Sequence, residues 1–219
     1  NAYLRVRNDT TPISSFLENT QFTFNVNDTF TMINSTMKVT GIGNTNAIMI
    51  NVTFNAFNFI LNNSNFTSLS KLYINYNNLT TLPPEIWNLT NLQILQLVYN
   101  KLTTLKGSPT VIYGNFICNN NSLITLEGGP VRIGPLEGGP VRVGLGYSTF
   151  RVRHNKIKSL VGAPTYVGGE FDVSNNSELE SLEGIPQQVI GDFYCYNNKI
   201  EFTQAQIRAL CDVKGNVYV

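Results

Sequence analysis

The chain has 219 residues, of which 42% are hydrophobic and 11% aromatic. This is enough apolar material to bury a core, and it excludes intrinsic disorder. Only 13% of the residues are charged, and 15 lysines and arginines against 14 acidic residues leave a net charge of +1, which disfavours a surface built to bind nucleic acid. The most apolar stretch, 47–61, is interrupted by three asparagines, so no membrane-spanning helix is expected.

Hydrophobic and polar residues alternate along residues 1–66, which predicts β structure. The alternation at 22–26 and 30–32, on either side of the turn residues Asn27 and Asp28, predicts a hairpin. Further strands are expected at 37–39, 48–54 and 57–61, with a bulge between the last two. About five short strands with few charges predict a β-sandwich-like domain over residues 1–66.

From about Phe66 onward the sequence repeats itself. The segment LYINYNNL at 72–79 returns as LQLVYNKL at 95–102. Strand-like segments that begin with a phenylalanine continue the series, and an asparagine follows each of them, in the pairs Phe116 and Asn121, Phe150 and Asn155, Phe171 and Asn176, Phe193 and Asn198. Self-similarity at a regular spacing predicts a solenoid, because each unit buries its apolar face only by stacking on its neighbours.

These units resemble the leucine-rich repeat, L-x-x-L-x-L-x-x-N-x-L, over roughly the last 150 residues, and LPPEIWNLTNL at 82–92 is close to its common form. The later units, with VGGEF at 167–171 and LEGIP at 182–186, are similar to a shorter, strand-rich variant found in proteins of tailed bacteriophages and other large viruses. That variant often ends in a helix and a K-G-x-x-Y-V strand, as at 214–219. The resemblance implies a virion protein.

In each unit, alternate strand residues and the following asparagine are expected to point inward, and Gly and Pro are expected to close the coil. Thr203 and Gln206 form a capping box that predicts a helix to about Leu210, which would cover the open end. The expected fold is mainly β: the N-terminal β-sandwich-like domain of 1–66, then a leucine-rich-repeat-like solenoid over 67–219. Its C-terminal cap, a helix and a strand, is expected over 202–219.

One unit departs from the spacing. LEGGPVRIG at 126–134 is almost duplicated by LEGGPVRVG at 136–144, and the step from Asn121 to Asn155 is correspondingly long. Ten residues are too few for a coil. We therefore expect the second copy to form a protruding loop or hairpin.

The three cysteines have no C-x-x-C spacing that would suggest a zinc site. Cys118 and Cys195 occupy the same inward position about three coils apart, too far for a disulfide. We expect free core thiols, and the pair of Cys195 with Cys211 is the one disulfide that the sequence leaves open.

Catalytic machinery is not expected. The single histidine, His154, lies within a repeat beside Arg153, and no pattern around it fits nucleophilic catalysis. The local carboxylates Asp172, Glu178, Glu180 and Glu183 fit a solvated repeat edge better than a glycoside-hydrolysing pair. The sequence therefore predicts a protein that is not an enzyme, with no catalytic residues, no cofactor and no metal.

The strand residues that alternate with the core are expected to face solvent in two rows. One row contains Tyr73, Gln96, Ile117, Arg151, Asp172 and Tyr194; the other contains Asn75, Val98, Asn119, Arg153, Ser174 and Tyr196. Tyr and Arg are enriched at binding hot spots. The candidate ligand-binding residues are therefore Arg151, Arg153, Tyr194, Tyr196, Tyr73 and Asp172, the alternative being that they only solvate the sheet.

A basic run surrounds two of these candidates. Arg132, Arg142, Arg151, Arg153, Lys156 and Lys158 are opposed only by Glu137. The run fits an acidic partner or a glycan, or simply the exposed residues of a strand and its loop. Nucleic acid is not expected, because no aromatic residues are interleaved with the basic ones.

The expected function is that of a non-enzymatic virion structural protein, of decoration or fibre type, at the virion surface. Residues 1–66 would dock on other virion subunits in a homo-oligomeric or multicopy assembly, and the solenoid would serve assembly or bind a host-surface protein or glycan. The alternative is a secreted or cell-surface leucine-rich-repeat adhesin that binds protein or glycan. Ten Asn-x-Ser/Thr sequons suit that alternative: Asn8, Asn27, Asn34, Asn51, Asn62, Asn65, Asn78, Asn88, Asn120 and Asn175.

Overall fold

The computed structural model describes residues 4–7, 38–41, 47–50, 71–75, 79–82, 84–135 and 148–219. Its strands form two sheets, one of ten strands and one of five, which we call the long sheet and the short sheet. Along the solenoid, the long sheet contains β4 (Lys71–Ile74), β5 (Ile94–Gln96), β7 (Asn115–Ile117), β9 (Phe150–Arg151), β11 (Phe171–Asp172), β13 (Phe193–Tyr194) and β15 (Val217–Tyr218). The short sheet contains β6 (Val111–Ile112), β8 (Arg132–Ile133), β10 (Tyr166–Val167), β12 (Gln188–Val189) and β14 (Asp212–Val213).

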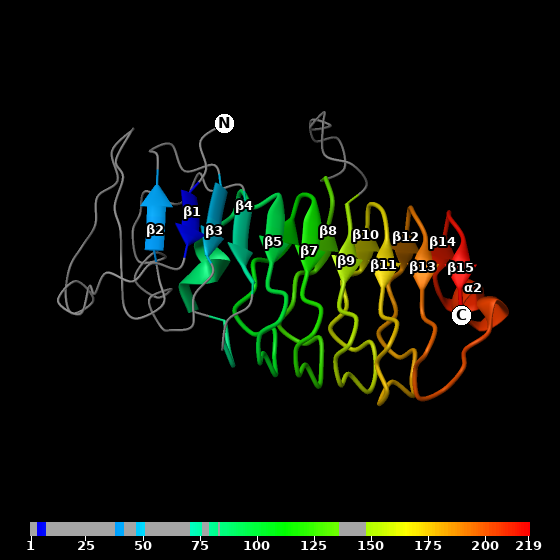
Figure 1. The fold of residues 1–219 in the computed structure, drawn as a ribbon. Helices are drawn as coiled ribbons and strands as arrows, with labels where there is room; N and C mark the ends of the chain where they lie inside the picture. Colours follow the sequence, from blue (N-terminus) through cyan, green and yellow to red (C-terminus); the bar gives the residue numbers. More distant parts are fainter. Residues whose placement is uncertain are drawn as a thin grey trace.

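The chain winds as a parallel β-solenoid, as the repeats predict. From β6 onward, successive strands alternate between the two sheets, and each pairs in parallel with the equivalent strand of the next coil. Figure 1 shows the coils as a regular stack, with the long sheet in front and the short sheet behind. A short 3₁₀ helix, η2 (Pro84–Asn88), lies between β4 and β5.

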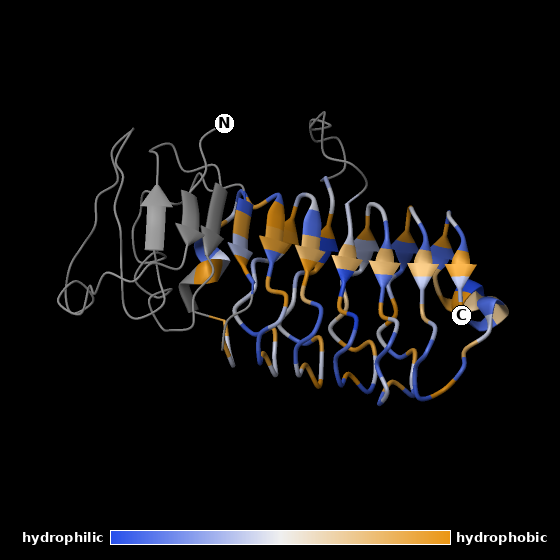
Figure 2. Cartoon of the chain, in the orientation of Figure 1, coloured by the Kyte–Doolittle hydropathy of each residue, from blue (hydrophilic) through white to orange (hydrophobic). Residues whose placement is uncertain are grey.

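Apolar side chains fill the space inside the coils. Phe116, Phe150, Phe171 and Phe193 are fully buried and lie in one file, with ring centroids 5.2, 5.4 and 4.9 Å apart. In the two coils before them, Leu72 and Leu95 occupy the same file, because the strand registers align them with Phe116. Figure 2 shows hydrophobic and hydrophilic residues mixed in every described coil, since inward residues alternate with outward ones.

Each coil turns at an asparagine that points inward, as the sequence predicts. Asn176 Nδ2 donates to the carbonyls of Val173 in its own coil and Val152 in the preceding coil, at 2.8 and 3.3 Å. Its Oδ1 accepts from the backbone N–H of Asn155. Five equivalent corners have a non-glycine residue with positive φ directly before the asparagine: Tyr99, Asn120, His154, Asn175 and Asn197.

The opposite corner requires glycine. Gly162 and Gly184 have φ of 87° and 84°. A Cβ on Gly162 would lie 2.3 Å from the backbone nitrogen of Glu127 in the preceding coil, so any side chain there would force neighbouring coils apart.

The C-terminal cap forms as expected. Helix α2 (Gln204–Leu210) begins at Thr203, whose side chain accepts from Gln206 N while Gln206 Oε1 accepts from Thr203 N, and it buries Ile207. Arg208 on this helix donates to the carbonyls of Val213 and Gly215, at 2.7 and 2.8 Å. Strand β15 then closes the long sheet against β13.

The predicted N-terminal domain is described only in part. Strands β1 (Leu4–Arg7), β2 (Lys38–Gly41) and β3 (Ala47–Ile50) join the long sheet: β3 pairs in parallel with β4, β1 in parallel with β3, and β2 antiparallel with β1. The sequence predicts β2 and β3 but not β1. The expected hairpin over 22–32 and the strand over 57–61 lie outside the described residues, so the β-sandwich and the boundary near residue 66 stay predictions.

The long unit has its extra residues where the duplication predicts them. Strand β7 pairs directly with β9, Phe116 opposite Phe150, so the additional residues lie between β8 and β9. The second copy of the motif, 136–144, lies outside the described residues, and its expected loop or hairpin stays a prediction.

All three cysteines are free and buried, as predicted, and the disulfide that the sequence left open between Cys195 and Cys211 does not form. Burial raises the pKa of the Cys195 and Cys211 thiols to about 12 and about 11, and it raises that of Cys118 further still. All three are therefore protonated at neutral pH and behave as small apolar side chains.

Candidate functional site

The outward residues of the long sheet form the row that the sequence predicts. The registers place Tyr73, Gln96, Ile117, Arg151, Asp172 and Tyr194 side by side in successive strands. Tyr218 of β15 extends the row beyond Tyr194. Tyr73 lies on β4, separated from Arg151 by β5 and β7, so it does not join the other candidates. We call the cluster formed by Arg151, Arg153, Glu170, Asp172, Tyr194, Tyr196 and Tyr218 the Tyr/Arg face.

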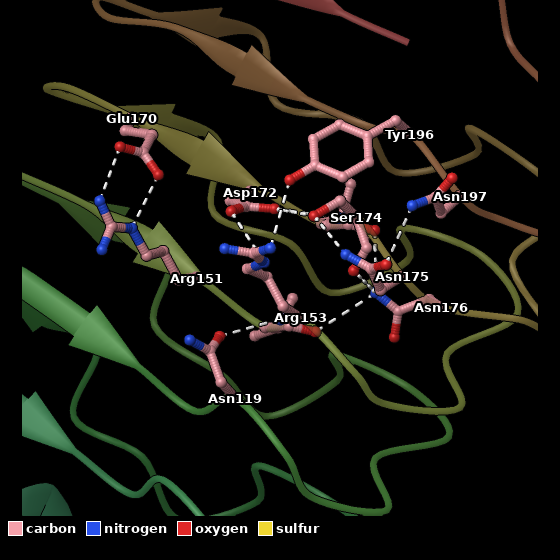
Figure 3. Close-up of polar contacts among 12 residues, drawn as sticks. Asn119, Arg151, Arg153, Glu170, Asp172, Ser174, Asn175, Asn176, Tyr196 and Asn197 are labelled. Carbon is pink, nitrogen blue, oxygen red and sulfur yellow. Dashed lines mark hydrogen bonds and ion pairs between the residues drawn. The ribbon is translucent and has the colours of Figure 1, made fainter.

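Arg151 is fixed by a carboxylate of the next coil. Its Nε and Nη2 donate to the two oxygens of Glu170, at 2.7 and 2.8 Å (Figure 3). The hydrogen bonds to Glu170 raise the pKa of the Arg151 guanidinium. This bidentate geometry holds the guanidinium plane in one orientation across the sheet.

Arg153 lies over Asp172, which corrects the expectation that Asp172 faces solvent. Asp172 is only 3% exposed. Arg153 Nε lies 3.5 Å from Asp172 Oδ2, an ion-pair contact without hydrogen-bond alignment, and its Nη2 donates to the Tyr196 hydroxyl at 3.2 Å (Figure 3). Ser174, in the other outward row, is also fully buried.

Asp172 is therefore a structural anion beneath the Tyr/Arg face. Its Oδ1 accepts from the Ser174 backbone N–H at 3.0 Å and from the Ser174 hydroxyl at 2.6 Å. Burial nevertheless raises the Asp172 pKa, because the Ser174 hydrogen bonds and the Arg153 charge only partly replace the lost water. Strand alternation places Asp172 on the outer face, so the sequence does not predict this burial.

Three tyrosines complete the face toward the C-terminal end of the sheet. The rings of Tyr194 and Tyr218 stack with centroids 4.6 Å apart, and Tyr196 meets Tyr194 edge-on at 6.4 Å. The Tyr194 hydroxyl donates to Asp192 Oδ2. Desolvation, followed by the Asp192 and Glu170 charges, raises the Tyr194 pKa to about 12, so the phenol stays neutral. Tyr218 was missed as a candidate, although the repeat phase of the strand at 217–218 places it in the row.

The residues considered for catalysis do not gather. His154 is exposed at the corner before Asn155. Glu178 and Glu180 form ion pairs with Lys158 and Lys199 of neighbouring coils. In the part of the chain that the structure describes, no three His, Cys, Asp or Glu side chains come together as a metal site.

The basic run divides between the two sheets. Arg132 lies on the short sheet, where its guanidinium carbon is 3.7 Å from the centroid of the Tyr166 ring. Arg151 lies on the long sheet, while Lys156 and Lys158 are exposed on the loop that follows. Arg142 lies outside the described residues. Of the described basic residues, only Arg151 and Arg153 therefore belong to the Tyr/Arg face.

No known family model matches the chain, and no curated protein is significantly similar to it. None of the helices in the described ranges is long and apolar enough to cross a membrane.

Proposed function

We propose that the chain is a non-enzymatic binding and display protein whose Tyr/Arg face contacts a protein or glycan. One observation carries this proposal: two arginines and three tyrosines gather on the last coils of the long sheet and are already held in place by their neighbours. Arg151 is clamped by Glu170, Arg153 bridges Asp172 and Tyr196, and Tyr194 stacks on Tyr218. Tyr and Arg dominate binding hot spots, and a preformed arrangement lowers the entropy lost on binding.

The test variant must keep Arg153, because Arg153 is the ion-pair partner of the buried Asp172. Replacing Arg153 would leave Asp172 buried and unpaired, so the test variant is Arg151→Ala, Tyr194→Ala and Tyr218→Ala in one chain. The matched control is Arg132→Ala with Tyr166→Ala, a cation and a ring removed from the short sheet. Both variants should fold, as judged by circular dichroism and thermal melting.

The expected result is that the triple variant no longer attaches to the surface or particle that the wild-type protein binds, while the control attaches normally. Unchanged attachment by a folded triple variant would reject the Tyr/Arg face as the binding surface.

We propose further that the chain is a structural protein of a virion, built from leucine-rich-repeat-type coils, with the solenoid displayed at the virion surface. The resemblance of the later repeats supports the virion context. The inward asparagines and the buried leucines from Leu72 to Leu182 support coils of the leucine-rich-repeat type. Residues 1–66 would contact other virion subunits, with many copies per particle. Cross-linking mass spectrometry on native particles should place inter-subunit links in residues 1–66, and links confined to the solenoid would contradict the docking role.

The runner-up is a secreted or cell-surface adhesin. One described sequon favours it directly: Asn88, at the end of η2, is exposed and accessible to a glycosyltransferase. Asn175 is less accessible, because its Nδ2 donates to Ser174 and its Oδ1 accepts from Asn197. The intact mass of the native protein decides: hexose-containing adducts on Asn88 support the adhesin, and an unmodified mass supports the virion protein.

A further inference from the structure

The charges of the Tyr/Arg face are already satisfied within the protein. Both nitrogens of Arg151 that face Glu170 are used in the bidentate pair, and the Arg153 guanidinium is shared between Asp172 and Tyr196. Asp192 adds a third carboxylate beside Tyr194. An anionic ligand would meet the carboxylates of Glu170 and Asp192, and it would have to compete with Glu170 and the buried Asp172 for the two arginines. The electrostatics therefore disfavour an acidic ligand.

The aromatic part of the face is partly open. Tyr194 and Tyr218 stack with only 9° between their planes, and Tyr218 remains 42% exposed. A ring in this state offers apolar surface at its face and a hydroxyl at its rim. It therefore suits a ligand that has both C–H and O–H groups.

Fixed donors and acceptors lie beside the tyrosines of this face. The ion pair of Arg151 with Glu170 presents guanidinium N–H groups beside carboxylate oxygens. The Tyr196 ring meets Tyr194 edge-on, and Asp192 accepts from the Tyr194 hydroxyl. A sugar hydroxyl both donates and accepts, so it gains most where both kinds of group are adjacent and immobile. Neighbouring strands lie about 4.8 Å apart, so the face spans the strands from β9 to β15.

We propose that the Tyr/Arg face binds an uncharged oligosaccharide, with a pyranose ring packed against the tyrosines at Tyr218 and its hydroxyls bonded to the paired charges. This inference rests on the proposed function and specifies the ligand class of that same face. The sugar's C–H groups supply the contact with the rings, and no charge is transferred or neutralised.

The test uses the full-length chain against an immobilised panel of neutral oligosaccharides built from glucose, galactose, mannose and N-acetylhexosamines. A matched panel carries sialic acid, uronate or sulfate. We expect binding to at least one neutral glycan, with a Kd that changes less than about twofold between low and high salt, because no net charge is exchanged.

Variants then assign the binding to the face. Tyr218→Ala should weaken the neutral glycan about tenfold or more, Tyr218→Phe should retain most of the affinity, and Tyr166→Ala on the short sheet should leave it unchanged. Salt-sensitive binding to acidic glycans alone, or no binding to either panel, would overturn the oligosaccharide ligand.

The binding role of the Tyr/Arg face and its oligosaccharide ligand can be contradicted independently of each other. If the triple variant loses attachment but no neutral glycan binds, the ligand class is wrong and the binding face stands. If neutral glycans bind the wild type and the Tyr218→Ala variant equally well, the glycan site lies elsewhere and this inference is overturned.

Discussion

At the scale of single residues, the buried asparagines form hydrogen bonds with backbone groups that apolar core side chains cannot satisfy. At each coil corner, backbone groups turn away from the strand pairing and would lose water without a partner. One carboxamide satisfies them, because it both donates and accepts. Asn155 Nδ2, for example, donates at 3.0 Å to Cys118 O and Val152 O, while its Oδ1 accepts from Leu123 N.

Asn176→Ala should lower the free energy of unfolding by about 3 kcal/mol, because it leaves the carbonyl of Val173 and the N–H of Asn155 unpaired in the interior. Urea denaturation measures the loss. Gln187→Ala, at an exposed position of the next coil, serves as the control and should change stability by less than about 0.5 kcal/mol. Equal effects of the two substitutions would contradict the structural role of the asparagine.

The raised pKa of Asp172 predicts that its contribution to the stability of the protein depends on pH. Its pKa is raised in the folded state, so the folded protein holds a proton that the unfolded chain has already released. Its contribution to stability is therefore largest below the unfolded pKa of about 3.9 and declines as the pH rises through the raised value.

Asp172→Asn removes this titration. The stability of the wild type relative to this variant should fall as the pH increases from about 3.9 through the raised pKa, as measured by urea titration of both proteins at each pH. A difference that rises over that window would show that Arg153 and Ser174 outweigh burial and that the pKa is lowered instead.

At the scale of elements, the solenoid ends where a side chain replaces a coil. In the preceding coil, the carbonyls of Val189 and Gly191 accept from Lys214 N and Gly215 N of the last coil. In the last coil, the equivalent carbonyls of Val213 and Gly215 accept from the guanidinium of Arg208. Helix α2 thus places two N–H groups where another turn of backbone would lie.

Arg208→Ala should destabilise the protein by about 1–2 kcal/mol and accelerate amide hydrogen exchange at 212–215. Arg208→Lys should recover only part of the loss, because one ammonium lacks the planar fork that reaches both carbonyls. Lys214→Ala in the same coil removes only an exposed ion pair with Asp212 and should cost less than about 0.5 kcal/mol. A cost for Arg208→Ala no larger than that control would contradict the capping role.

The elements differ in how well the sequence predicts them. The helix is predictable from its capping box, and the solenoid part of the long sheet from the repeat, in which phenylalanines mark β7, β9, β11 and β13. The short sheet is not predicted, because strands such as Tyr166–Val167 are two residues long and give no periodicity to detect.

The sequence also predicts that glycines help to close each coil. Gly107, Gly128, Gly162 and Gly184 have the positive φ that such turns require.

At the scale of the whole molecule, the phase of the repeat is what makes a surface predictable. It places Arg151, Asp172 and Tyr194 in neighbouring strands, and the registers confirm that order. The repeat phase does not reveal which outward residues are buried, because a long side chain from a neighbouring coil can cover an outward residue. Arg153 covers Asp172 in this way, so one of the six candidate residues is a buried support rather than a contact.

The binding role of the Tyr/Arg face is tested most directly by oxidative footprinting of the full-length protein, alone and attached to its native target. Hydroxyl radicals modify exposed tyrosines, and mass spectrometry reads each one separately. We predict that Tyr194, Tyr196 and Tyr218 lose reactivity on attachment while Tyr166 on the short sheet keeps it. Protection of Tyr166 with unchanged reactivity at Tyr194, Tyr196 and Tyr218 would contradict the account.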